Sequence, residues 1–182
     1  MQEESSHLHN YVYSSDMVEF IAVSNACCQF FEQPNGVDGK AFIEQSVKHL
    51  SGVYAAIVKL EETEPQIESV WEPTVTEQEW SAVFQRISML LGAHNDTLRQ
   101  AEDEEFDRSD LVTHTISEDI SDVYQELRDF TTIYSRGMEE LMNDAAWELK
   151  ERFAEHWGKK LLRSLMALHD LYIQGIDPTE KE

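Results

Sequence analysis

The chain has 182 residues, with 36 acidic and 14 basic side chains and a formal net charge of −22. Nucleic acids and anionic membranes are negatively charged and bind through clustered Lys and Arg, so this composition excludes both as direct partners. It favours a basic protein partner or a bound cation. Apolar residues make up 41% of the chain, and only 7 Gly and 4 Pro occur, which favours long helices over many short strands.

Export and membrane signals are missing from the sequence. The N-terminus, MQEESSHLHN, has neither a basic nor an apolar signal segment, and no window approaches about eighteen apolar residues. The two cysteines, Cys27 and Cys28, are adjacent, and neighbouring cysteines on a helix rarely form a disulfide. We therefore expect a cytoplasmic protein with one domain over residues 1–182 and disordered tails over about 1–12 and 175–182.

Two helices are predicted in the first third of the chain. The first covers about 16–33 and ends at Pro34 and Gly36, which terminate helices. The second covers about 39–62, because apolar side chains recur there at steps of three and four: Ile43, Val47, Leu50, Tyr54 and Ile57. Gly52 lies inside this helix at a cost of up to about 1 kcal/mol relative to Ala.

A loop with two prolines over 63–75 precedes the third predicted helix. Thr76 and Glu79 have the spacing of a capping box directly before a run of apolar residues, and this helix ends near Gly92. The segment that follows is the least regular of the chain. We expect a short helix at about 94–101 and then an exposed acidic turn, and we find no segment with the alternation of a strand.

The last two predicted helices carry the longest apolar stripes. The fourth covers about 115–136 and ends near Gly137. The fifth stripe extends from Met138 to Tyr172 in steps mostly of four, which predicts one long curved helix or a bend at Gly158. Together the pattern predicts an all-α, single-domain bundle of about five mostly antiparallel helices with a long C-terminal helix.

Four carboxylates form a row in ISEDISDVYQELRDF, at steps of three, four and three: Asp119, Asp122, Glu126 and Asp129. A helical wheel centred on Ile120 places Asp122 and Asp129 at about 180–200°, away from the apolar face, and Asp119 and Glu126 at its boundary. One interpretation is a solvated helix face. The other is a site in which Asp119 and Glu126 reach into a groove and share Mg²⁺ or Mn²⁺ with a carboxylate of another helix.

Catalytic motifs are absent or incomplete. There is no glycine-rich phosphate loop and no Gly-x-Ser-x-Gly turn. Glu126-x-x-Asp129 resembles half of the magnesium motif of the all-α nucleotide pyrophosphohydrolases, but the Glu-Glu-x-x-Glu half is missing. The Glu-x-x-His pairs of di-iron bundles are missing at all four of these histidines: His94, His114, His156 and His169.

Two tryptophans of the fifth helix, Trp147 and Trp157, are candidates for a partner surface, because tryptophan is enriched where proteins bind each other. Trp147 does not fall cleanly on the apolar stripe, which marks it as the better candidate of the two. The alternative interpretation is that both side chains belong to the core.

Three stretches resemble a bacterial family known as domain of unknown function 5063: VEFIAVSNACCQFFE, ISEDISDVYQELRDF and MNDAAWELKERFAEHWGKKLLRSLMALHDL. The resemblance covers roughly residues 12–173. It implies an all-helical protein and no activity, because none is assigned to the family. Its most characteristic pieces are Glu118-Asp119, Tyr124 and Trp157-Gly158-x-Lys160-Leu161.

Two functional hypotheses from different classes follow. In the first, the protein is a non-catalytic interaction or scaffold module without a cofactor, which binds a protein partner of basic character through a helix groove or its acidic face. In the second, it is a hydrolase of a phosphorylated small molecule that uses Mg²⁺ or Mn²⁺. The second hypothesis requires the four carboxylates of the acidic row to line a cleft.

Overall fold

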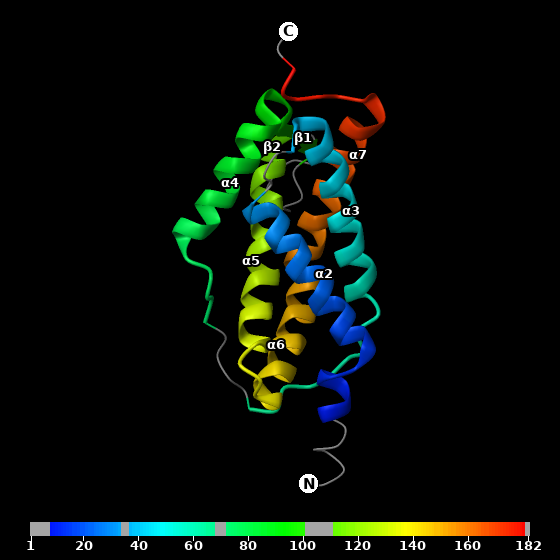
Figure 1. The fold of residues 1–182 in the computed structure, drawn as a ribbon, viewed down its shortest axis with the longest axis vertical. Helices are drawn as coiled ribbons and strands as arrows, with labels where there is room; N and C mark the ends of the chain where they lie inside the picture. The colour runs from blue at the N-terminus through cyan, green and yellow to red at the C-terminus, as the bar shows by residue number, and fades with distance from the viewer. Residues whose placement is uncertain (1–7, 34–36, 68–71, 101–110, 181–182) are drawn as a thin grey trace.

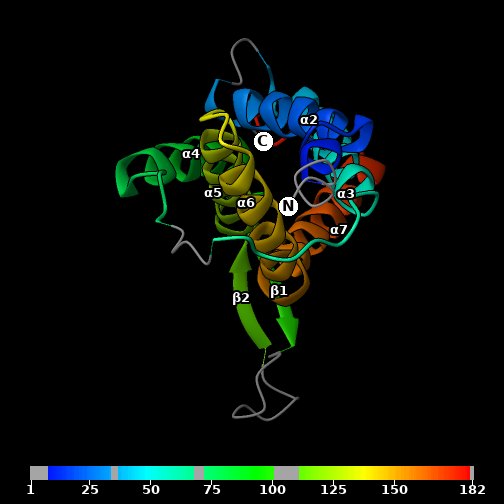
Figure 2. The same cartoon turned by 90° about the horizontal axis from the view of Figure 1, so that it is seen from below.

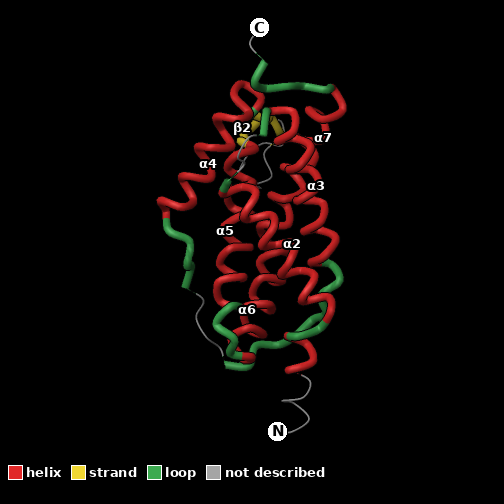
Figure 3. Tube along the Cα trace, in the orientation of Figure 1, coloured by secondary structure: helices red, strands yellow, loops and turns green. Residues whose placement is uncertain are grey.

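The computed structural model describes residues 8–33, 37–67, 72–100 and 111–180. Besides the helical residues 8–12, six α-helices lie in these ranges (Figure 1, Figure 3): α2 Ser15–Glu32, α3 Gly39–Ile57, α4 Glu77–Leu91, α5 Ile116–Tyr134, α6 Glu139–Arg152 and α7 Gly158–Gln174. The prediction of an all-α bundle is confirmed. None of the helices in the described ranges combines the length and the apolarity needed to cross a bilayer.

Local capping explains where several helices begin. The first backbone N–H groups of a helix have no partner within it, and a side chain just before the helix satisfies them. Ser14, Asp38 and Thr115 accept hydrogen bonds from the backbone N–H of Met17, Ala41 and Glu118. The predicted capping box is confirmed, because Thr76 and Glu79 each bind the other's backbone N–H at the start of α4.

Helix α5 forms the centre of the fold, in contact with α2, α4, α6 and α7. The apolar stripe predicted for it is buried: Ile116, Ile120, Val123, Leu127 and Phe130. Phe130 packs against Phe20 of α2 with ring centroids 5.5 Å apart. Because α5 contacts four other helices, it is covered on its polar side as well as its apolar side. The acidic row of α5 therefore lies against other segments of the protein.

A β-hairpin replaces the short helix predicted at 94–101, and that prediction is wrong. Strand β1, Asp96–Gln100, pairs antiparallel with β2, Leu111–Thr115, with Asp96 opposite Thr115. The hairpin extends from the side of the bundle opposite α2 (Figure 2). The predicted acidic turn falls in residues 101–110, outside the described ranges.

Asn95 joins this hairpin to the start of α5. Its backbone oxygen accepts from the N–H of Ile116, and its side-chain oxygen accepts from the N–H of Ser117, both at 2.9 Å. Its amide nitrogen donates to the hydroxyl of Ser117 at 2.9 Å. Asn95 is 5% exposed, so these bonds satisfy a buried polar side chain.

Both predicted tails are partly ordered, which corrects the prediction of disorder over 8–12 and 175–180. Residues 8–12 are helical, with Tyr11 and Val12 buried. At the other end Pro178 lies against Gly39, where an added Cβ would come within 2.6 Å of the proline ring. Residues 1–7 and 181–182 of the predicted tails lie outside the described ranges.

The C-terminal stripe is interrupted by one π-helical turn, Phe153–Trp157, between α6 and α7. The N–H of Gly158 donates to the carbonyl oxygen of Phe153, five residues earlier, so one extra residue is inserted in the turn. This turn lies directly before Gly158, where the sequence predicts a bend as one of two alternatives. The absence of a side chain at residue 158 lets the ring and the carbonyl group of Phe153 pack against the backbone.

Two glycine substitutions are expected to change stability in opposite directions. A Cβ at residue 158 would lie 2.9 Å from the Phe153 ring and closer to its carbonyl oxygen, so Gly158→Ala is expected to lower the free energy of unfolding by about 1–3 kcal/mol. A Cβ at residue 52 meets nothing within 4 Å, so Gly52→Ala is expected to raise it by up to about 1 kcal/mol. Urea unfolding followed by circular dichroism measures both, and changes of the same sign would contradict this account.

Candidate functional site

The acidic row of α5 faces other segments of the protein. Asp119 is 5% exposed and forms a two-point ion pair with Arg163 of α7, at 2.7 Å from Nη2 to Oδ1 and 3.0 Å from Nε to Oδ2. Asp122 accepts a hydrogen bond of 2.9 Å from the indole N–H of Trp80 on α4 and pairs with Lys160 of α7. These two carboxylates therefore join α5 to its neighbours on both sides.

The other two members of the row also have partners. Glu126 pairs with Arg152 of α6 at 2.5 Å; burial raises the pKa of this carboxyl above its ordinary value, against the lowering effect of Arg152. Asp129 is 4% exposed, and its Oδ1 accepts from the N–H and hydroxyl of Thr74 and from the N–H of Val75 at 2.6–2.7 Å. It thereby holds the segment that leads into α4.

The solvated interpretation of the row fails at two of its four carboxylates. The solvated face is wrong for Asp119 and Asp129, because α7 and the segment before α4 cover them. Each carboxylate has its own protein partner, and among the described residues no group of three or more His, Cys, Asp and Glu side chains is arranged to hold a metal ion. Binding of Mg²⁺ or Mn²⁺ stays a prediction of the sequence, without a site formed by the described residues.

A second pair of buried polar side chains, Asn143 and Asp144 on α6, holds the loop after α3. Asp144 accepts hydrogen bonds from the N–H groups of Gln66 and Ile67 at 2.6 and 3.0 Å. Asn143 donates to the carbonyl oxygen of Glu64 at 2.7 Å. Both side chains are at most 6% exposed, so their role is to position this loop against the lower end of the bundle in Figure 1.

Trp157 is not part of a partner surface, which corrects that prediction. It is 1% exposed, its indole N–H donates to the carbonyl oxygen of Leu149 at 3.0 Å, and its ring meets that of Phe153 edge-on at 4.6 Å. The π-helical turn ends at Trp157 and includes Phe153, so this contact belongs to the core at that turn. Trp147 is half-buried, and its role in binding stays a prediction.

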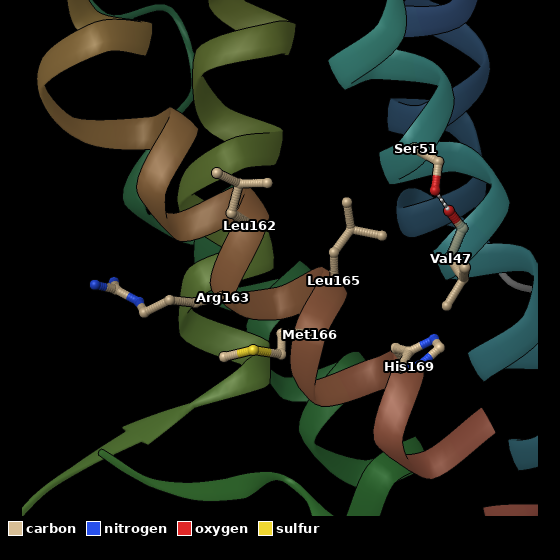
Figure 4. A pocket seen from close by; sticks show the side chains of 7 residues that line it. All are labelled: Val47, Ser51, Leu162, Arg163, Leu165, Met166 and His169. Carbon is tan, nitrogen blue, oxygen red and sulfur yellow. Dashed lines mark hydrogen bonds between the residues drawn. The ribbon is translucent and has the colours of Figure 1, made fainter. Parts of the chain in front are cut away.

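An open groove between α3 and α7, with a volume of about 520 Å³, is the candidate functional site. Leu165 and His169 extend from α7 toward α3, whereas the guanidinium group of Arg163 points away from α3 (Figure 4). The groove is lined by Val47 and Ser51 from α3 and by Leu162, Arg163, Leu165, Met166 and His169 from α7, and most of its exposed surface is apolar. Such a surface binds apolar groups.

The groove exists because α7 has more apolar surface than the bundle covers. One row of the helix is buried in the core: Leu161, Ser164 and Leu168. A second row, rotated by roughly 140° from the first, is about half-exposed or more. It consists of Leu162, Met166 and Ile173, with exposed fractions between 48% and 66%.

The sequence analysis missed this second row, although its signal is present. The predicted stripe followed Leu161, Leu165 and Leu168 and omitted Leu162 and Met166, which recur beside it at a step of four. A helix that packs on one side needs an apolar stripe a little over about 100° wide. A wider apolar arc on α7 indicates a face left for another molecule.

Charges around the groove are largely compensated within the protein. Arg163, which lines it, is paired with Asp119. Lys48, one residue from Val47, forms an exposed ion pair of 2.6 Å with Glu44. Ser51 directs its hydroxyl to the carbonyl oxygen of Val47 at 2.6 Å. The groove therefore offers apolar contact within a protein whose net charge is −22.

Comparisons with known proteins locate the chain in one family. The family model described as a domain of unknown function, DUF5063, matches residues 11–174, so the resemblance drawn from the sequence is confirmed. No curated protein matches the chain. The crystal structure of protein BF1032 from Bacteroides fragilis is similar, with a TM-score of 0.77 and 27% identity over 88% of this chain and 94% of that one.

Proposed function

Since this chain belongs to the family of domain of unknown function DUF5063, whose name assigns no activity, we propose its role from its own surface. It is a non-catalytic interaction module of the cytoplasm that docks a protein partner in the groove between α3 and α7. The observation that carries this proposal is the second apolar row of α7, where Met166 is 50% exposed and Ile173 is 66% exposed. An apolar row beside an open groove is typical of a binding surface.

The polar residues of the fold support the same proposal. The four carboxylates that a hydrolase would use for a cation are engaged by Arg163, Lys160, Arg152 and the segment at Thr74. Within the described ranges, the two buried cysteines carry thiols whose pKa values burial raises, so they are poor nucleophiles. The groove, in contrast, offers an accessible surface with few polar groups of its own.

Photo-cross-linking from the groove tests the proposal. A benzophenone amino acid replaces Met166 in cells that make the protein naturally, and Met89, which is 79% exposed on α4, is replaced in the control. We expect position 166 to cross-link one protein species, mapped by mass spectrometry, and position 89 to give no such product. A Leu162→Glu substitution beside position 166 is expected to remove the product, because it places a charge in the groove.

Two results would contradict the proposal. The same products from positions 166 and 89 would show that exposure, and not the groove, determines cross-linking. A product from position 166 that persists with Leu162→Glu would show that the apolar row does not hold the partner. Leu162 is 48% exposed, so the substitution leaves the core unchanged, and circular dichroism confirms folding.

A further inference from the structure

We infer that the segment docked between α3 and α7 is an amphipathic helix with basic flanks, supplied by a different protein. This inference rests on the proposed function and deepens it, because it specifies the secondary structure and the charge of the occupant. Three observations support it: the internal hydrogen bonding of the two helices that form the groove, the spacing of the apolar row of α7 and the net charge of the whole protein.

The walls of the groove favour a helix over an extended peptide. Both walls are helices, whose backbone N–H and C=O groups are paired along the helix, and the Ser51 hydroxyl is used on the oxygen of Val47. An extended peptide needs partners for its own backbone groups, as it finds at the edge of a sheet. A helix satisfies its backbone internally and needs only apolar contact from the groove.

The apolar row of α7 has the dimensions of a helix-binding surface. Its members Leu162, Met166 and Ile173, with His169 between them, recur at steps of four, three and four. The row therefore extends along about 16 Å, or three helical turns, of α7. A partner helix that lies along it presents its own apolar residues at the same steps, in the way that two helices of a bundle pack.

Charge identifies the flanks of the partner helix. The protein has 36 acidic and 14 basic residues, and much of the basic minority is engaged in ion pairs: Lys48, Lys59, Arg128, Arg152, Lys160 and Arg163. The uncompensated charge is therefore negative. A second copy of this chain also has a net charge of −22, so two copies repel each other. A helix rich in Lys and Arg is instead attracted by the negative charge of this protein.

Three synthetic peptides of about eighteen residues test the inference against the full chain. The first carries Leu and Met at helical steps with Lys and Arg elsewhere. The second keeps the same apolar residues and replaces each basic residue by Glu. The third has the composition of the first with its apolar residues moved off the helical spacing. Fluorescence anisotropy at about 50 and 200 mM salt measures the dissociation constants.

We expect the first peptide to bind at least about tenfold more tightly than the other two at low salt, with a smaller advantage at high salt. Leu162→Glu and Met166→Glu are expected to weaken its binding at least about tenfold. Met89→Glu, which adds the same charge to an exposed methionine of α4, is expected to leave binding close to that of the unaltered protein. This control separates a local effect in the groove from a general effect of one more negative charge.

Other outcomes overturn the inference in distinguishable ways. Equal binding of the basic and acidic peptides, still lost with Met166→Glu, would overturn the basic flanks and leave the docking groove standing. Equal binding of the first and third peptides would overturn the helix. A dimer in analytical ultracentrifugation that Met166→Glu dissociates would identify a second copy as the occupant. Failure of the cross-linking from position 166 would contradict the proposed function itself.

Discussion

Replacement of Arg163 by Met is expected to lower the free energy of unfolding by about 3–5 kcal/mol, because it removes one partner of a buried ion pair and leaves the other partner charged. Arg163 and Asp119 have side chains that are only 15% and 8% exposed. Removal of the guanidinium group leaves the carboxylate of Asp119 buried between α5 and α7 without its two-point partner. Urea unfolding at neutral pH measures the loss.

An exposed ion pair of the same protein provides the control. Lys59 and Glu19 form a pair at 2.8 Å with side chains 46% and 49% exposed, so Lys59→Met is expected to cost less than about 1 kcal/mol. The double substitution Asp119→Leu with Arg163→Met is expected to recover most of the stability lost in the single one, because it removes the stranded charge. A loss that stays equal in the single and double variants would show that packing, and not charge, is responsible.

Replacement of Asp129 by Ala is expected to lower the free energy of unfolding by about 2–4 kcal/mol. The backbone N–H groups of Thr74 and Val75 both donate to its Oδ1, and Val75 is 8% exposed, so the substitution leaves buried donors without an acceptor. The segment before α4 is also expected to open more often. Limited proteolysis at Val75, together with urea unfolding, measures both effects.

Two variants sharpen this prediction. Asp129→Asn keeps one acceptor oxygen and is expected to lose less stability than Asp129→Ala. Glu118→Ala removes an exposed carboxylate from the first turn of the same helix and is expected to cost at most about 1 kcal/mol. If Glu118→Ala and Asp129→Ala had equal effects, the hydrogen bonds to Thr74 and Val75 would not explain the role of Asp129.

The course of the main helices was predictable because the signals for helices are local. The capping box at Thr76 and Glu79 and the apolar stripe of α5 both depend on residues within a few turns of each other. The predicted end of the second helix was less accurate, at 62 instead of Ile57. Leu60 turns into the core there, and its carbonyl oxygen accepts a hydrogen bond from Lys150, a contact between distant residues that local periodicity does not encode.

The role of each acidic residue, in contrast, depended on contacts between distant parts of the chain. A helical wheel shows which way Asp129 points, but not that the segment at Thr74 covers it. The choice between a partner surface and the core for Trp157 depended on such contacts as well, because a π-helical turn and the ring of Phe153 bury it. The hairpin was missed because its strands pair with each other across residues 101–110, and short strands lack a strong periodic signal.

The sequence by itself determined an all-α bundle, the starts of α2 to α5 and the negative charge. Periodicity and capping depend on residues close to one another in the chain, and net charge depends on composition alone. Tertiary structure alone decided which polar residues are buried and which apolar residues stay exposed. The carboxylates of α5 bind α7 and the segment before α4, because these two segments pack against the acidic row. The row through Leu162 and Met166 stayed exposed beside the groove because no helix of the described chain covers it.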